Sequence, residues 1–220
     1  VCDLASKSCM VHHCESCPGT PALVAKLDSI DFLLESDVMF KQWQSTDRTS
    51  LNTLTLVPDD FNEFTATKFD ADTSHSFIAR SQAQYLKDRK ANLQSDTAII
   101  LADFSENYSY VIQDEVQGYH WNKEQCTLHP IVLYVKNLSL DVYSFCFISD
   151  DLVHDVGFVY AMQKKLMHYI QANFPQIQFT EYSSDGCSGQ YKNYKNFHNL
   201  TYHKHDFGIT ASWSFFAMSH

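Results

Sequence analysis

Two aspartates have the positions best suited to chemistry. Asp103 lies near the end of the apolar run 97–104, and Asp185 follows the apolar run 177–183. If both runs are parallel strands, the two carboxylates meet at the carboxyl edge of the sheet, where α/β proteins bind ligands. Paired carboxylates repel each other unless a cation or a proton lies between them. The pattern predicts a Mg²⁺ or Mn²⁺ site that activates water or a 3′-hydroxyl toward a phosphodiester.

Structural roles are the alternatives for these and for nearby polar residues. Asp185 precedes Gly186 and could belong to a turn, and Asp103 could cap a turn or helix. Glu106 could be an outer metal ligand or a solvent-facing turn residue. His154 could act as a proton shuttle near the metals, with Asp155 beside it, or the two residues could be a capping pair at a helix start. Phosphate contacts, or a plain polar helix face, are predicted for Gln190, Lys192 and Lys195.

Four of the seven cysteines lie within the first seventeen residues: Cys2, Cys9, Cys14 and Cys17. Clustering at one end favours metal binding in a reducing compartment over a secreted disulfide scaffold. The C-x2-C spacing at the end of the cluster suits a tetrahedral structural zinc site. A segment this short cannot bury a core without metal. Disulfides or free thiols are the alternatives, and His12 or His13 could replace Cys2.

The order of predicted elements indicates the α/β class. Residues 21–95 are expected to be mainly helical, with helices at 21–35, 59–69 and 74–92 and a short strand at 49–57. A strand at 97–104 is followed by residues 105–128, for which the pattern predicts no definite shape. The remaining elements are a hairpin (129–135 and 142–149), a helix capped by Asp150–Asp151 that ends at 174, a strand (177–183), a helix (188–203) and a strand (209–217). This order predicts a mixed sheet with helices on both faces, as in ribonuclease H-like proteins.

The composition of the chain narrows the class of protein further. The hydrophobic fraction of 45% and charged fraction of 19% are those of a packed globular protein, so disorder is not expected. No apolar run is long enough to span a membrane, and no secretion signal is recognisable. The net charge of −10 argues against nucleic-acid binding by bulk attraction. Catalytic aspartates account for part of this charge, and basic DNA-reading parts are expected elsewhere, because we interpret the chain as a fragment.

Several strings resemble a family. They are 9–18, which contains CESCP, 42–44 (QWQ), 102–108 (ADFSENY), 149–155 (SDDLVHD), 184–193 (SDGCSGQYKN) and 215–220 (FFAMSH). They are similar to a group of uncharacterised animal proteins that resemble cut-and-paste DDE transposases and their domesticated derivatives. The resemblance covers essentially the whole chain. Its motifs are specific as family markers and less specific as evidence of activity.

The resemblance implies a zinc-binding module at 1–20, a helical segment at 21–95 and a ribonuclease H-like core at 96–220, incomplete at its C-terminus. Asp103 and Asp185 would be the first two acids of the triad, with the third on a helix after the last strand. The implied function is metal-dependent DNA cleavage and strand transfer in the nucleus by a homo-oligomer. The alternatives are an inactive domesticated derivative that binds DNA or protein, and a cellular nuclease that hydrolyses without joining ends.

Overall fold

The computed structural model describes residues 1–29, 37–45, 47–111, 113–114, 118 and 123–217. The end of the predicted helix 21–35 and the last three residues of the motif 215–220 lie outside the described residues. The chain divides into two compact units, Val1–Ser81 and Gln82–His220. This boundary falls inside a long helix, whereas the sequence analysis placed boundaries at residues 20 and 95.

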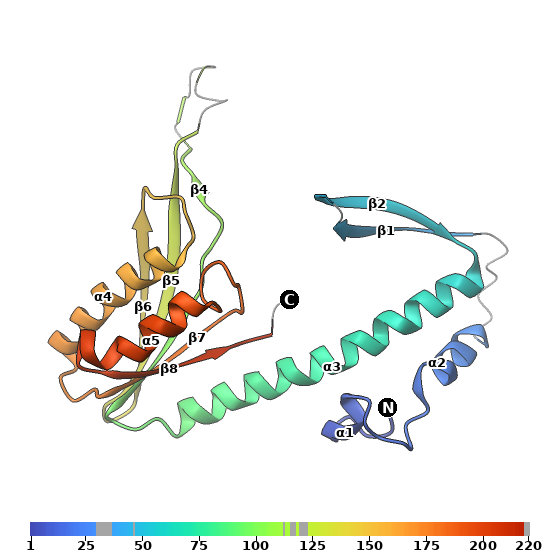
Figure 1. Ribbon diagram of the computed structural model, residues 1–220, viewed down its shortest axis with the longest axis horizontal. Helices are drawn as coiled ribbons and strands as arrows, with labels where there is room; N and C mark the ends of the chain where they lie inside the picture. The colour runs from blue at the N-terminus through green and yellow to red at the C-terminus, as the bar shows by residue number, and fades with distance from the viewer. Residues whose placement is uncertain (30–36, 46, 112, 115–117, 119–122, 218–220) are drawn as a thin grey trace. The chain divides into compact units, whose positions relative to one another are not determined.

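The first unit contains short helices and one hairpin (Figure 1). Its elements are α1 (Lys7–Met10), α2 (Gly19–Asp28), β1 (Val38–Ser45), β2 (Thr49–Leu56) and the first part of α3 (Pro58–Ala91). β1 and β2 pair antiparallel from Val38↔Leu56 to Ser45↔Thr49. β1 was not predicted from the sequence, because its half-buried positions include the polar residues Gln42 and Gln44, which hide the apolar alternation.

The helices predicted at 59–69 and 74–92 form one continuous helix, α3. The expected break was wrong because residues 70–73 contain neither proline nor glycine, so nothing interrupts the backbone hydrogen bonds. The Thr73 hydroxyl donates to the carbonyl of Phe69 within the helix, 2.7 Å away. Pro58 at the first position and two acids in the first turn favour the start of the helix.

The second unit is built on a mixed sheet, as predicted. The strand order is β6 (Leu140–Ser149), β5 (Gln125–Lys136), β3 (Thr97–Ala102), β7 (Phe179–Ser184) and β8 (Thr210–Phe215). β3, β7 and β8 are parallel neighbours, and β5 is antiparallel to both β3 and β6. β4 (Tyr108–Ser109) pairs with the start of β5.

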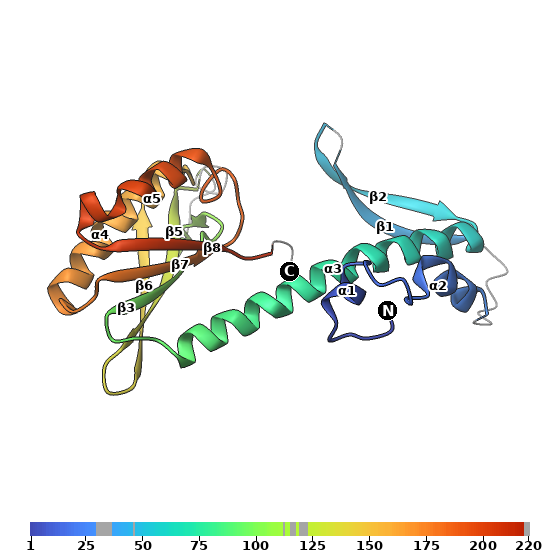
Figure 2. The same cartoon turned by 60° about the horizontal axis from the view of Figure 1, so that its bottom comes forward.

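Helices flank both faces of this sheet. α4 (Val156–Asn173) and α5 (Tyr194–Phe207) lie side by side on one face (Figures 1 and 2). The apolar side of α4, including Met162 and Leu166, packs in one cluster with Ile100 and Leu133 of the sheet. This cluster is the main core of the unit.

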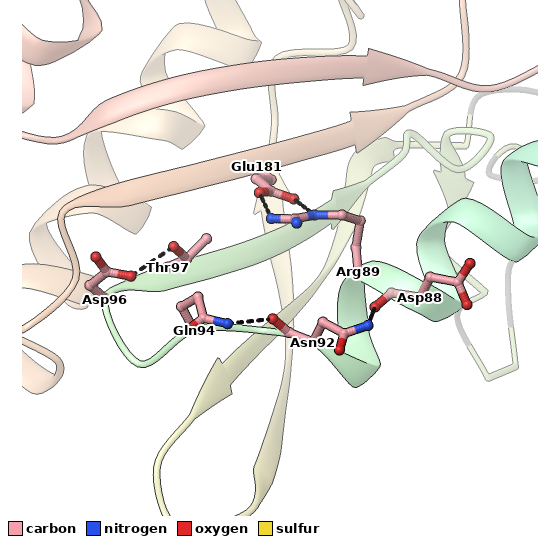
Figure 3. Close-up of polar contacts among 7 residues, drawn as sticks. All are labelled: Asp88, Arg89, Asn92, Gln94, Asp96, Thr97 and Glu181. Carbon is pink, nitrogen blue, oxygen red and sulfur yellow. Dashed lines mark hydrogen bonds and ion pairs between the residues drawn. The ribbon is translucent and has the colours of Figure 1, made fainter.

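The end of α3, from Gln82 onward, lies against the other face. Arg89 donates two hydrogen bonds to the carboxylate of Glu181 on β7, one of them 3.0 Å long (Figure 3). Lys90 lies over the ring of Tyr134 on β5, 4.7 Å from its centroid. Glu181 and Tyr134 are both register partners of Ile99 on β3, so they share one face of the sheet.

Two predicted helix starts were wrong. α4 is capped by Asp155, whose side chain accepts from the amide of Phe158. Asp151 lies in the segment before the helix, where its side chain accepts from the amide of Val153. α5 starts at Tyr194 rather than at 188. Residues 187–192 form a tight turn in which the Cys187 carbonyl accepts from the amides of Gln190, Tyr191 and Lys192.

Candidate functional site

The two predicted aspartates lie at the same edge of the sheet. β3 and β7 are paired in parallel up to Leu101↔Ser183, and Asp103 and Asp185 follow these strands. Both aspartates line one cavity of about 300 Å³, together with residues of β3, β5 and β7 and with Phe216. Asp103 is exposed and Asp185 is half-buried. The structure therefore brings together two carboxylates that are far apart in the sequence.

The carboxylate of Asp185 is held by its own loop. Its Oδ1 accepts from the amide of Cys187, 3.2 Å away. This contact is the turn role that the sequence analysis gave as the alternative for Asp185. The turn role coexists with a position in the cavity, because the contact engages one of the two carboxylate oxygens.

Tyr191 was not among the predicted site residues. Its side chain is fully buried, and its hydroxyl lies 2.9 Å from Nε2 of His129. Burial raises the pKa of Tyr191, and the charges of Asp103 and Asp185 raise it further. Its place in the string SDGCSGQYKN was the only signal in the sequence.

His129 is neutral in this surrounding. Burial lowers its pKa to about 4, against an opposing backbone hydrogen bond. The ring of Phe104 packs edge-on against His129, with centroids 4.4 Å apart. Phe104, His129 and Tyr191 therefore form a group of uncharged rings in contact with one another.

The residues predicted to surround the metals lie outside the lining of this cavity. His154 stacks on Phe104 with centroids 4.5 Å apart, and its Nε2 lies 2.7 Å from the side-chain oxygen of Asn107. Asp155 caps α4, and Glu106 is exposed. Asp155 has the capping role given as its alternative, and Glu106 has the solvent-facing position given as its alternative. His154 contacts Phe104 and Asn107 and does not form the expected capping pair.

The predicted phosphate contacts are only partly helical. Gln190 and Lys192 lie in the turn before α5, not on the helix, because the Cys187 carbonyl binds both amides. The Lys192 ammonium lies 5.9 Å from the ring centroid of Phe215. Lys195 is in the first turn of α5 and is exposed.

The four N-terminal cysteines form a cluster. The sulfur of Cys2 lies 3.4, 3.7 and 3.5 Å from the sulfurs of Cys9, Cys14 and Cys17, and all four lie within 4.8 Å of one another. These distances exceed the roughly 2.05 Å of a disulfide. They are close to the edge of about 3.8 Å in a tetrahedron of sulfurs around zinc. The predicted grouping is confirmed, and the cluster could hold a metal such as zinc.

The hydrogen bonds within the cluster shift two cysteine pKa values in opposite directions. Hydrogen bonds from Ser6 and Cys2 lower the pKa of the Cys9 thiol to about 7, whereas the hydrogen bonds with Cys9, Cys17 and Cys14 raise the pKa of the Cys2 thiol to about 12. A metal requires thiolates, so the support for a metal site is the grouping of the four sulfurs. Cys2 is the fourth cysteine of this cluster, beside Cys9, Cys14 and Cys17. His12 does not replace it, because its ring contacts the carbonyl and the carboxylate of Asp70 on α3.

The part of the chain that the structure describes contains no helix that is both long and apolar enough to cross a membrane.

Comparison with curated proteins and comparison with solved structures gave no significant match. A family model described as Domain of unknown function (DUF8700) matches residues 1–71, and another, Domain of unknown function (DUF8701), matches residues 82–220. The second match begins at residue 82, where the second compact unit also begins. The DUF8701 model matches more than half of the chain, so the chain belongs to the DUF8701 family.

Proposed function

We propose that residues 82–220 are a ribonuclease H-like core related to DDE transposases, which cleaves and joins DNA with divalent cations at Asp103 and Asp185. The observation that carries this proposal is that both aspartates line one cavity from adjacent parallel strands. The carboxyl ends of parallel strands are the usual place for ligand sites in α/β sheets.

The topology supports the ribonuclease H-like assignment. The order β6-β5-β3-β7-β8, in which β5 alone runs antiparallel, is the order expected for that fold. The crossover helices α4 and α5 connect successive parallel strands of this sheet. Topology supports the fold proposal, while the reaction depends on the carboxylates.

The two carboxylates suit Mg²⁺ or Mn²⁺, which prefer oxygen ligands. Such an ion would neutralise charge on a phosphodiester and activate the attacking oxygen. Asp103 and Asp185 would bind it and so orient the phosphate. The amide of Cys187 donates to Asp185 and holds this carboxylate in place.

A domesticated, inactive derivative that binds DNA or protein is the second candidate. Among the described residues, the four cysteines are the only group of three or more His, Cys, Asp or Glu side chains arranged to hold a metal. The described part of the chain thus places no third acid with the two aspartates. In either case we propose DNA as the partner, a homo-oligomeric state, a nuclear location and zinc in the cysteine cluster, where it would orient a contact surface.

The test combines cation binding with cleavage by the whole chain. Mn²⁺ binding is measured by electron paramagnetic resonance for the unmodified protein and for Asp103→Asn and Asp185→Asn. We expect each change to weaken Mn²⁺ binding strongly and to abolish Mg²⁺- or Mn²⁺-dependent DNA cleavage. Asp150→Asn, which changes an exposed acid after β6, is the matched control and should change neither.

The outcomes separate the candidates. Unchanged Mn²⁺ binding in both variants would show that the site assignment is wrong. Binding without cleavage favours the inactive derivative. Cleavage without joining of a 3′-hydroxyl end to target DNA favours the cellular nuclease.

A further inference from the structure

The layer formed by α4 and α5 differs in charge from the rest of the chain. The whole chain has 16 basic and 26 acidic residues, yet these two helices contain four exposed lysines and one acid, Asp206. The Asp206 carboxylate accepts from the Tyr160 hydroxyl at 3.0 Å and lies 2.9 Å from Nδ1 of His205. The lysines are Lys164, Lys165, Lys195 and Lys204. The exposed side of this layer is therefore a basic surface on an acidic protein.

Two hollows lie between the helices. One, of about 720 Å³, is lined by Lys164, Lys165 and His168 and by the end of α5. The other, of about 660 Å³, is lined by Lys195 and His198 and by the start of α4. Tyr160 lines the second hollow and Asp206 the first, so their hydrogen bond bridges the two helices between the hollows. Each hollow contains lysine and histidine.

Exposed rings accompany the lysines on α5. Tyr194, His198, Tyr202 and His205 are spaced so that they share one side of the helix. Tyr194 and Tyr202 are 76% and 50% exposed. The ring centroids of His198 and Tyr202 lie 4.9 Å apart, and those of Tyr202 and His205 lie 6.3 Å apart. These residues form a row of accessible rings beside Lys195.

We propose that this surface binds an unpaired nucleic-acid strand, with the lysines near the phosphates and the rings of α5 against the bases. Lysines that neutralise phosphates and aromatic rings that stack on bases are the two features of single-strand binding surfaces. An amphipathic peptide or a membrane would need a contiguous apolar patch, and among the described residues of these two helices Phe197 is the one exposed large side chain without a polar group. The described residues of α4 and α5 include no exposed large aliphatic side chain.

The inference rests on the proposed function only for the choice of DNA over RNA as the probe. Binding of fluorescent single-stranded oligo-dT to the whole chain is measured by anisotropy in EDTA over a range of salt concentrations. We expect Lys164→Ala/Lys165→Ala to weaken binding about tenfold. The same change should reduce the slope of log binding constant against log salt concentration by about 1.4, because each phosphate contact on a single strand contributes about 0.7. Lys123→Ala/Lys136→Ala makes the same change in charge elsewhere in the unit and should leave binding unchanged.

The rings are tested separately. Tyr194→Leu/Tyr202→Leu should weaken oligo-dT binding about tenfold, because base stacking is lost. Binding of inorganic polyphosphate, which has no bases, should be unchanged, and a duplex should bind less tightly than the single strand. Equal losses for polyphosphate and oligo-dT would overturn the stacking role.

Equal losses in the two lysine variants would overturn the surface assignment. Thermal unfolding confirms that each variant is folded.

The EDTA condition separates this inference from the proposed function. Asp103→Asn and Asp185→Asn should retain oligo-dT binding in EDTA, because the α4–α5 lysines bind without a cation. If those variants retain binding while the unmodified chain shows no cleavage, the proposed activity fails and the binding surface stands. If cleavage depends on the aspartates but binding ignores the lysine and tyrosine changes, only the binding surface fails.

Discussion

The two compact units are stabilised in different ways. In the described part of Val1–Ser81, the buried apolar residues are Cys9, Met10 and Ala66. In Gln82–His220, a continuous apolar cluster joins the sheet to α4 and α5. A small unit with so little buried surface needs another source of stability, and the four cysteines provide a place for one. The comparison indicates that metal should stabilise the first unit and apolar burial the second.

Metal removal should give the largest effect. We expect about one zinc per chain, with an apparent binding free energy on the order of 10 kcal/mol. A chelator should therefore increase hydrogen exchange throughout residues 1–29 while β3 and β5 remain protected. Metal analysis and hydrogen exchange measure both effects. Cys14→Ser should lose the zinc, whereas Cys146→Ser, at an exposed position on β6, should retain it. Zinc-free protein with normal protection would refute the contrast between the units.

A core truncation should affect the second unit next most strongly. Leu133 on β5 is fully buried within the apolar cluster. Leu133→Ala should lower the free energy of unfolding by about 2–5 kcal/mol, because it removes buried methyl groups and leaves a cavity. Val142→Ala, at an exposed position on the neighbouring strand, should cost less than about 0.5 kcal/mol. Urea unfolding monitored on the second unit measures both. Equal costs would contradict the assignment of this core.

Acid should destabilise the second unit through His129. Burial lowers its pKa from 6.5 to about 4, so the unfolded chain binds the proton more readily than the folded one. His129 therefore does not change the free energy of unfolding above about pH 6.5. Its protonation in the unfolded chain should lower the free energy of unfolding by about 3 kcal/mol as the pH drops toward 4. Burial also lowers the pKa of His203, which adds loss in the same direction.

His129→Gln tests this assignment. The glutamine amide can retain a hydrogen bond to Tyr191 but does not titrate. The melting temperature of this variant should change less between pH 6.5 and pH 4 than that of the unmodified protein. The same pH dependence in both proteins would assign the acid sensitivity to other groups.

The smallest expected effect concerns the end of α3. Arg89→Ala removes both hydrogen bonds to Glu181 and should cost about 1 kcal/mol, because both side chains are partly exposed. A double-mutant cycle with Glu181→Gln isolates the contribution of the pair. A coupling energy near zero would mean that the ion pair does not help to attach residues 82–91 of α3 to the sheet.

Local patterns in the sequence predicted much of the second unit. The apolar run before Asp103 and the hairpin that became β5 and β6 were recognisable, because alternation and continuous apolar runs report burial directly. The starts of α4 and α5 were misplaced, because Asp155 and Asn193 compete with other polar residues nearby as capping candidates. The strand β1 was missed because its partner β2, rather than its own apolar pattern, defines it.

The candidate sites also differ in how far the sequence alone predicted them. The cysteine cluster was predictable from spacing, because its four ligands lie within one short segment whose chain can fold around a single ion. The contact of Tyr191 with His129, 62 residues away, had no signal in the sequence, because each residue alone looks like an ordinary core aromatic. The same is true of the α4–α5 surface, whose lysines and rings belong to separate helices.

Sequence patterns alone were sufficient for the α/β class, the four-cysteine group and the two aspartates at strand ends. Each of these is encoded in residues close together along the chain. The tertiary structure was needed to show that Asp103 and Asp185 line one cavity, that α3 is continuous and that His154 and Asp155 have structural contacts. The reason is that strand order and helix packing depend on the free energy of burying many distant apolar side chains together, which no local segment specifies.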